Sequence, residues 1–510
     1  MRILPSLIVV SIFLFASAST VVKYPTLYQV SARPWLYELS QERGVTITAL
    51  KDIPDDVLQS IKDQGFDYLW IMGVWKIGKY GIQHDRTKPS LVESYKKLLD
   101  DYTEEDAIGC PYSIAEYVCN PELCPGGDED LKALREKLNG MGIKLMLDFV
   151  PNHSALDSPW VDKDITYYIR KPEGEPDDPE LYYKNGIAYG NMEGMTDRWT
   201  DVAQLNYWEP KTIELMKQNL LHIAELADGI RCDVAWLVAN KYFYRSWKKE
   251  LDAYGYKQPT EEFWTVAIKE LKEKYPNVIL MAEVYGEPFK DLLEQGFDYT
   301  YEKTLLDKLI DGQIDGIKNW ISYIREYQDH QSRFLENHDD NRAVAFFGGN
   351  VKKTIAAALA TYTLPGMRFF FQDFYNGYQN KLEVHLRRSK KEAVSEEAKA
   401  FYGKFLPILN DDTLKNGEWS HKAINGGSSW KLLSWEWFNA ETKNKKVIVV
   451  NFSDTPGEGT VVLSDVSGEG EVVVKDLLND TEYKKDATEL KTKGLTVTVK
   501  AWYAVILDYN

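Results

Sequence analysis

The sequence predicts a (β/α)8 barrel with an inserted subdomain after its third strand and a C-terminal antiparallel β-sandwich. From about residue 30 to 375, short apolar runs alternate with longer amphipathic stretches, the pattern of strands each followed by a helix. Eight apolar runs occur there, the number of strands that closes such a barrel. After about residue 418 the pattern changes to short β-rich runs separated by Gly, Asn, Asp and Ser.

The expected strands of the barrel share a short apolar run, and the expected helices share apolar residues at three- and four-residue spacing. The strand candidates are residues 35–39, 66–72, 143–150, 229–235, 278–284, 297–301, 333–337 and 367–372. The clearest helices are residues 130–138, 211–226 and 261–274, each directly before a strand candidate. This alternation predicts a barrel domain over residues 19–418.

A long segment, residues 152–207, separates the third strand from the helix that leads to the fourth. Loops of that length in compact domains are usually functional or form a small subdomain. Because the segment leaves the end of the barrel where active sites are built, we expect it to wall a substrate cleft.

The last part of the chain, residues 419–510, is expected to form the β-sandwich. Its strand candidates are residues 430–437, 446–452, 460–463, 471–474, 496–499 and 503–507.

The N-terminal residues 1–18 predict a signal peptide. A charged start is followed by an apolar run over residues 3–15 and by the small residues Ala16-Ser17-Ala18. A membrane anchor is the alternative, but the run is short against the roughly 20 residues that span a bilayer. We therefore expect cleavage near Ala18, export to the periplasm or the cell exterior, and no membrane attachment after cleavage.

Composition and charge narrow the class of partner. The net charge is -17 and no long Lys/Arg cluster occurs, which argues against a nucleic-acid partner because phosphates demand a basic face. A neutral substrate fits an acidic protein better. The sequence does not indicate an oligomeric state.

The four cysteines divide into a cluster and a single residue. Cys110, Cys119 and Cys124 lie close together, whereas Cys232 lies in a hydrophobic run and is expected to be a buried thiol. In an exported chain the cluster predicts one disulfide, with its pairing open. A metal site is the weaker interpretation, because no His lies nearby at ligand spacing.

Four of the apolar runs end at or near an acidic residue, and the ends of barrel strands converge on one rim. These residues are Asp148, Asp233, Glu283 and Asp339. A single strand-end acid more often caps a helix. Four such acids together indicate catalysis instead. The chain has only seven His, and two of them follow an Asn close to these acids. Cleavage at an anomeric carbon is a chemistry that needs paired carboxyl groups.

Retaining glycosidases hold two carboxyl groups about 5–5.5 Å apart, one to attack and one to protonate the leaving oxygen. Neighbouring strands four and five can supply this pair. Arg231 lies two residues before Asp233, on the same strand face, and is expected to keep Asp233 ionised with a low pKa. No cation lies within two residues of Glu283, which favours Glu283 as the group that keeps the proton.

These residues occur in motifs that resemble those of the α-amylase family of glycoside hydrolases, and the resemblance covers essentially the whole chain after the signal segment. The motifs, in the family's order, are Asp148-Phe149-Val150-Pro151-Asn152-His153, Gly229-Ile230-Arg231-Cys232-Asp233, Met281-Ala282-Glu283-Val284-Tyr285, and Phe334-Leu335-Glu336-Asn337-His338-Asp339 followed by Arg342. The resemblance implies retaining hydrolysis of α-linked oligosaccharides or polysaccharides.

The resemblance also implies residue roles. Asp233 would be the nucleophile, Glu283 the acid/base, and Asp339 the residue that braces the substrate hydroxyls and the transition state. The implied substrate-binding residues are Tyr112, His153, Arg231, His338 and Arg342. Asp148 and Asn152 would have a supporting, structural role.

The sequence departs from the family at two places. Many starch-cleaving members have Lys-His where this chain has Trp236 and Leu237. Gln204 stands where the family often has an acid tied to a structural Ca²⁺. A hard cation with fewer charged oxygens binds less tightly, so we expect no required cofactor and do not assume a calcium site.

Two other functions share these residues. In a transglycosylase a sugar hydroxyl replaces water, and Trp236 could form an apolar acceptor platform, although a buried packing role for it is at least as good an explanation. A catalytically silent sugar-binding protein is the other alternative, since fold does not fix function. Silent relatives usually lose a catalytic carboxylate, and this chain keeps all three.

Overall fold

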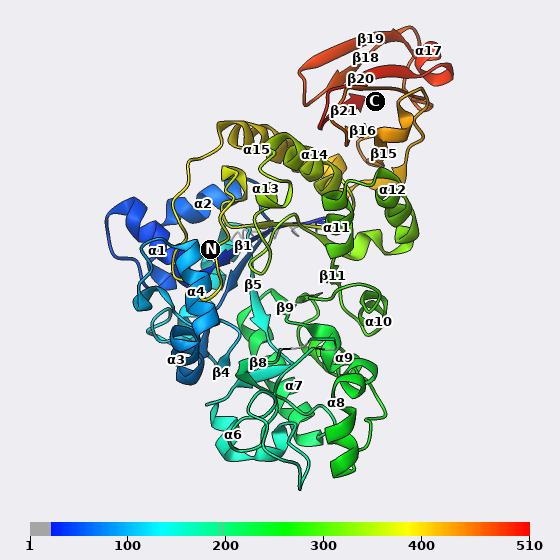
Figure 1. Cartoon of the computed structure of the whole chain (residues 1–510). Helices are drawn as coiled ribbons and strands as arrows, with labels where there is room; N and C mark the ends of the chain where they lie inside the picture. Colours follow the sequence, from blue (N-terminus) through cyan, green and yellow to red (C-terminus); the bar gives the residue numbers. More distant parts are fainter. Residues whose placement is uncertain (1–21, 193, 196, 510) are drawn as a thin grey trace, which may run out of the picture.

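The computed structural model describes residues 22–192, 194–195 and 197–509 (Figure 1). The signal peptide expected at residues 1–18 lies outside the described residues. Within those described ranges, no helix combines the length and the apolar character needed to cross a membrane.

Eight parallel strands close into a barrel, as predicted. In chain order they are β1 (Thr26–Ser31), β2 (Tyr68–Met72), β5 (Lys144–Phe149), β9 (Gly229–Cys232), β10 (Ile279–Ala282), β11 (Tyr299–Tyr301), β12 (Gln331–Arg333) and β13 (Met367–Phe371). Each strand pairs with its neighbours in this order, and β1 pairs with β13 to complete the ring. All the carboxyl ends therefore meet at one rim.

Helices surround the barrel and lie in its connections, and the last helix in chain order lies in the C-terminal domain (Figure 1). They are α1 (Ala32–Arg43), α2 (Asp55–Asp63), α3 (Lys79–Thr87), α4 (Pro89–Leu98), α5 (Asp128–Gly140), α6 (Pro159–Lys163), α7 (Pro210–Leu226), α8 (Asn240–Tyr254), α9 (Phe263–Lys274), α10 (Phe289–Glu294), α11 (Lys303–Asp311), α12 (Ile314–Tyr323), α13 (Ala343–Phe346), α14 (Val351–Tyr362), α15 (Glu396–Leu409), α16 (Asp412–Asn416) and α17 (Ala487–Thr492). The three helices predicted most clearly correspond to α5, α7 and α9.

The first strand lies earlier than the apolar pattern predicted. Residues 35–39 belong to α1, whose apolar residues form its buried face, and the strand is β1. All of β1 is buried, although half of its side chains are polar. Hydrogen bonds inside the protein allow polar side chains to be buried there. Thr26 Oγ1 donates to the Gly65 carbonyl oxygen at 2.7 Å. Internal pairing of polar side chains therefore concealed this strand from an apolar-run search.

The seventh strand shows the same effect. The predicted run 333–337 overlaps β12 only at Arg333. The strand itself consists of Gln331, Ser332 and Arg333, all buried. Arg333 Nη1 donates to Glu302 Oε2 at 3.0 Å, so its charge is paired in the interior. The apolar residues of the predicted run come after the strand has ended.

The segment between β5 and α7 forms the expected inserted subdomain. It contains β6 (His153–Ala155), β7 (Tyr189–Gly190) and β8 (Trp199–Gln204), which make a three-stranded sheet in the order β6-β8-β7. In Figure 1 this region, with α6, lies below the barrel in cyan and blue-green. A second excursion, not predicted, pairs β3 (Trp75–Ile77) with β4 (Ile114–Cys119) antiparallel.

The C-terminal domain is an antiparallel sandwich, as predicted (Figure 1, orange and red). Its six-stranded sheet has the order β14-β15-β16-β21-β18-β19, and β17 pairs with β20. The strands are β14 (Glu418–His421), β15 (Leu432–Phe438), β16 (Lys445–Asn451), β17 (Gly457–Val461), β18 (Glu471–Asp476), β19 (Thr481–Asp486), β20 (Leu495–Val499) and β21 (Tyr503–Tyr509). The sequence missed β14 and β19, the two edge strands, because their side chains are mostly polar and exposed.

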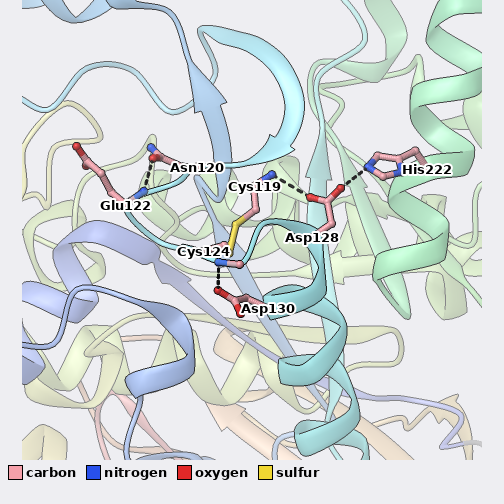
Figure 2. Close-up of a disulfide and its surroundings, with 8 residues drawn as sticks. Cys119, Asn120, Glu122, Cys124, Asp128, Asp130 and His222 are labelled. Atoms are coloured by element: carbon pink, nitrogen blue, oxygen red, sulfur yellow. Dashed lines mark hydrogen bonds and ion pairs between the residues drawn. A yellow bond between two sulfur atoms is a disulfide. The ribbon is translucent and has the colours of Figure 1, made fainter.

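One disulfide joins members of the cysteine cluster. The structure pairs Cys119 with Cys124, which resolves the pairing that the sequence left open (Figure 2). Cys110 is a free, partly buried thiol. Cys232 is free and buried, as expected from its hydrophobic run.

Candidate active site

The strand-end acids converge as the barrel topology requires. Asp148 lies near the end of β5, Asp233 follows β9, Glu283 follows β10 and Asp339 lies beyond β12. Asp233, Glu283 and Asp339 line one cavity of about 380 Å³, a volume within the usual range for small-molecule sites.

Arg231 connects the two candidate catalytic acids. Its Nη1 donates to Asp233 Oδ1 at 2.7 Å and its Nη2 donates to Glu283 Oε2 at 2.6 Å. The contact with Asp233 was expected. The contact with Glu283 was not expected, and it shows that Glu283 does have a fixed cation beside it. Residues that pair across β9 and β10 are far apart in sequence, so a search within two residues could not find it.

The pKa of Asp233 also differs from expectation. Burial raises it well above its usual value, and the negative charges of Glu283, Asp339 and Asp148 add to this effect, while Arg231 opposes it. A single guanidinium does not offset this much desolvation and repulsion. The cluster therefore holds a proton at pH values where an isolated aspartate would have lost it.

Glu283 is oriented by two further donors. The Val234 backbone N–H donates to its Oε2 at 2.7 Å, and the Tyr285 hydroxyl donates to its Oε1 at 2.6 Å. Val234 adopts a left-handed conformation, with φ 35°, which is unfavourable for a β-branched residue and positions this N–H. The sequence analysis missed Tyr285, although its two-residue spacing from Glu283 was a usable signal.

Asp339 belongs to a second network. His338 Nε2 lies 2.7 Å from the Tyr112 hydroxyl and 3.0 Å from Asp339 Oδ2. His338 Nδ1 lies 2.7 Å from Gln29 Nε2. The surrounding protein partly desolvates Asp339, which favours its neutral form, but the opposing effect of His338, with Arg231, leaves its pKa below the usual value. Asp339 is therefore ionised at neutral pH.

The predicted substrate-binding residues occupy different positions. Tyr112 and His153 line the cavity. Burial lowers the pKa of His153 to about 3, so its ring is neutral. Arg231 and His338 are fully buried and contact the acids from behind rather than facing the cavity.

Arg342 is not brought to the cavity. Its Nη1 donates to Glu336 Oε1 at 3.1 Å and to the Gln372 carbonyl oxygen at 2.6 Å, and its guanidinium lies over the Phe371 ring. Arg342 was predicted to lie beside the substrate. In the structure it pairs with Glu336 instead and does not line the cavity.

Asp148 has contacts of a supporting kind. Trp70 Nε1 donates to Asp148 Oδ2 at 2.9 Å, and Trp75 Nε1 donates to its backbone carbonyl oxygen at 2.7 Å. Asp148 Oδ1 lies 3.4 Å from Arg231 Nη1. The acid thus tethers the third barrel strand to the second and contributes negative charge behind the site.

Asn152 and Gln204 test whether a calcium ion fits where the family often binds one. Gln204 Nε2 donates to Asn152 Oδ1 and to the Asn152 carbonyl oxygen, both at 2.9 Å, and to the Leu205 carbonyl oxygen at 3.2 Å. Oxygens that would ligate a cation are thus taken by amide hydrogens. The residues present do not fit Ca²⁺ at this place.

Further charged or titratable side chains that were not predicted from the sequence line the same cavity: His84, Asp85, Lys88, Arg198, Asp201 and His385. The adjacent pair His84-Asp85 was the only local signal, since Lys88, Arg198, Asp201 and His385 are separated from it and mostly lie in unrelated segments.

Comparisons with known proteins agree with this fold. The catalytic domain of alpha amylase matches residues 55–456. Alpha-amylase 3 of Dictyoglomus thermophilum is 26% identical over 282 residues, 51% of this chain and 52% of that protein. A 4-alpha-glucanotransferase of Thermotoga neapolitana is 23% identical over 346 residues, 61% of this chain and 63% of that protein. The chain spans less than two thirds of the length of these curated relatives.

Solved structures show the same fold. A noncanonic maltogenic alpha-amylase from Thermotoga neapolitana superposes with a TM-score of 0.66 at 17% identity, over 96% of this chain and 99% of that one. The likeness thus includes both the barrel and the C-terminal domain.

Proposed function

Since this chain belongs to the alpha-amylase family of glycoside hydrolases, we propose that it hydrolyses α-glucosidic bonds of oligosaccharides or glucans with retention of configuration. The observation that supports this most strongly is the Arg231 guanidinium, which joins two buried carboxyl groups at the wall of one cavity. Asp233 is the nucleophile and Glu283 the acid/base.

In the first step Glu283 gives a proton to the glycosidic oxygen while an Asp233 oxygen attacks the anomeric carbon. The bond to the leaving sugar breaks and an ester to Asp233 forms. Asp233 must be ionised to attack, so the proton that the cluster retains must lie on Glu283 in the reactive state. Asp339, ionised beside His338, stabilises the positive charge that develops on the sugar ring.

In the second step Glu283, now ionised, takes a proton from water, and the water oxygen attacks the anomeric carbon and releases Asp233. Tyr285 and Val234 hold the Glu283 carboxyl group in one orientation through both steps. Two inversions give overall retention.

Transglycosylation is the second candidate, because a 4-alpha-glucanotransferase is among the relatives. The residue that suggested an acceptor platform, Trp236, is buried and packs edge-on against Tyr285, with ring centroids 5.5 Å apart. Trp236 therefore offers no exposed platform for an acceptor sugar, and we place hydrolysis first.

The test is to incubate the protein with a defined maltooligosaccharide and follow product length by chromatography and anomeric configuration by NMR. Shorter products released first as the α-anomer, absent with Asp233→Asn, are expected. The control is Asp340→Asn, which changes an acid that follows Asp339 in sequence and has no role in the proposal. Products longer than the substrate would favour transfer, and initial β-anomeric products would contradict retention.

We further propose that the enzyme needs no calcium, because the Gln204 amide binds the oxygens a cation would need. Activity and Tm are expected to be the same after dialysis against a chelator as after addition of calcium chloride. A loss of several degrees in Tm with chelator would contradict this.

Export to the periplasm or cell exterior is proposed from residues 1–18 alone. Expression of the full chain in a secreting host should give a mature protein that starts at Ser19, which N-terminal sequencing would detect. A secreted product that still carries Met1 would contradict it.

A further inference from the structure

The cavity around the catalytic acids has a second polar region, which we call the distal cluster. It consists of His84, Asp85, Asp201 and His385. The first two lie in α3 and Asp201 lies in β8, whereas His385 lies in the connection after β13. Elements inserted at three different places in the barrel thus bring two imidazoles and two carboxyl groups to one wall.

Asp85 is the fixed centre of the distal cluster and is only 1% exposed. Its Oδ1 lies 2.9 Å from His84 Nδ1, and its Oδ2 accepts the Cys110 backbone N–H at 2.9 Å. His84 Nε2 lies 2.8 Å from Thr200 Oγ1. These bonds lock both side chains, as a preorganised binding site requires.

His385 lies between two acids. Its Nδ1 is 3.1 Å from Glu383 Oε1 and its Nε2 is 4.0 Å from Asp85 Oδ2. Burial opposes a charge on the ring, but Glu383 and Asp85 together raise the pKa of His385 above its usual value. Because Nδ1 is paired with Glu383, the Nε2 atom is the ring nitrogen that remains available to the hydroxyl group of a ligand in the cavity.

Asp201 is the member that remains available to a ligand. It lines the cavity, and among the described residues its carboxyl group has no hydrogen-bond or ion-pair partner on another residue. Burial, with the nearby charge of Asp85, raises its pKa. Asp201 is only partly buried, so its carboxyl group faces the cavity and can accept a hydrogen bond from the hydroxyl group of a ligand or donate one to it.

The contacts of the distal cluster connect it to one part of the reacting centre. Cys110, which donates to Asp85, lies two residues before Tyr112, and the Tyr112 hydroxyl contacts His338 beside Asp339. The leaving oxygen must lie beside the general acid, and within the part of the chain that the structure describes Glu283 has no hydrogen bond or ion pair with the distal cluster. These contacts support a place for the cluster on the side of the sugar that is retained in the covalent intermediate.

We infer that Asp201 and His385 bind hydroxyl groups of the sugar unit next to the reacting ring, on its non-reducing side. The enzyme then prefers a glycon of two or more sugars over a single glucosyl unit. This inference rests on the proposed function and names its substrate class. It assigns binding to residues outside the four motifs.

The test compares nitrophenol release from p-nitrophenyl α-glucoside, which fills only the reacting position, with release from p-nitrophenyl α-maltoside, which also reaches the distal cluster. For the wild type, kcat/KM is expected to be higher for the maltoside. In Asp201→Ala and in His385→Ala the maltoside-to-glucoside ratio of kcat/KM should fall by about tenfold, the effect of losing a hydrogen bond to a charged group. Chromatography of the maltose formed confirms which bond is cut.

Two controls match the variants in residue type. Asp197→Ala and His330→Ala replace exposed residues and should keep the wild-type ratio. The conservative variants Asp201→Asn and His385→Gln guard against misfolding, since they preserve shape.

Three results would overturn the inference. A wild-type ratio at or below one is the first, and an unchanged ratio in the alanine variants is the second. The third is an equal loss on both substrates in the alanine and the conservative variants. Release of nitrophenol from neither compound by the wild type would overturn the proposed function and this inference with it, so the two failures are distinguishable.

Discussion

Arg231 is the residue on which the catalytic arrangement depends most. Its side chain is fully buried, and its guanidinium lies over the rings of Trp70, Tyr112 and Tyr301 at 5.3, 5.1 and 5.6 Å. The planar fork of arginine can donate to two carboxylates in fixed directions, which lysine cannot reproduce. The aromatic walls and the two acids together determine where the guanidinium sits.

A residue-scale prediction concerns the pH dependence of kcat/KM. The negative charge of Asp148 helps to raise the pKa of Asp233, and Asp233 must be ionised to attack. Asp148→Asn removes this charge and lowers the pKa of Asp233. The acidic limb of the kcat/KM profile should therefore move to lower pH than in the wild type, while Asp340→Asn should leave it in place. A move to higher pH in Asp148→Asn would refute this account of the site's electrostatics.

The sequence was sufficient to find the acids but not their environment. Asp233, Glu283 and Asp339 come at or just after apolar runs of the sequence, a pattern visible in one dimension. The second contact of Arg231 depends on the pairing of β9 with β10, and the distal cluster depends on three separate insertions. Such contacts have no signature in local spacing.

The excursion between β2 and α5 is the element that carries Tyr112 into the site. Tyr112 lies just before β4, and β4 ends at Cys119, which the disulfide joins to Cys124. At the start of α5, Asp128 accepts the Cys119 backbone N–H at 3.0 Å and lies 3.1 Å from His222 Nε2 in α7 (Figure 2). The C-terminal end of the excursion, after Tyr112, is thus attached to the barrel helices α5 and α7.

The disulfide should stabilise this element. The double variant Cys119→Ser/Cys124→Ser opens a small loop, and the chain-entropy model gives a loss of about 2 kcal/mol in the free energy of unfolding. Urea denaturation of oxidised wild type and variant measures it. Cys110→Ser, which alters a free thiol, serves as the control. Equal unfolding free energies for wild type and double variant would count against a stabilising role.

At this scale the sequence predicted helices better than strands. The amphipathic helices α5, α7 and α9 appeared within two residues of their observed bounds, because one apolar face suffices to identify them. β1 and β12 were misplaced, because a barrel interior tolerates polar side chains that pair with one another. A search for apolar runs therefore misses strands in which buried polar side chains take the place of apolar ones.

The barrel and the C-terminal domain share one apolar core. Trp435 Nε1 donates to Thr363 Oγ1 at 3.1 Å and Trp437 Nε1 donates to the Thr363 carbonyl oxygen at 2.8 Å. Both tryptophans lie in β15 and belong to the same apolar cluster as the barrel, whereas the other face of the sheet has its own core. The sequence predicted two domains but could not indicate that one sheet face is buried against the barrel, since both faces are apolar.

The most direct test of the central claim assigns roles to Asp233 and Glu283 in the intact protein by azide rescue. Each residue is replaced by alanine, and an activated aryl α-glucoside, preferably the better of the two p-nitrophenyl substrates, is supplied with sodium azide. With Asp233→Ala, azide should take the place of the nucleophile and give a β-glycosyl azide. With Glu283→Ala, azide should attack the ester on Asp233 from the opposite face and give an α-glycosyl azide. If Asp233→Ala gave the α-glycosyl azide and Glu283→Ala the β-glycosyl azide, or if both variants gave the same anomer, the assignment of Asp233 as nucleophile and Glu283 as acid/base would be contradicted.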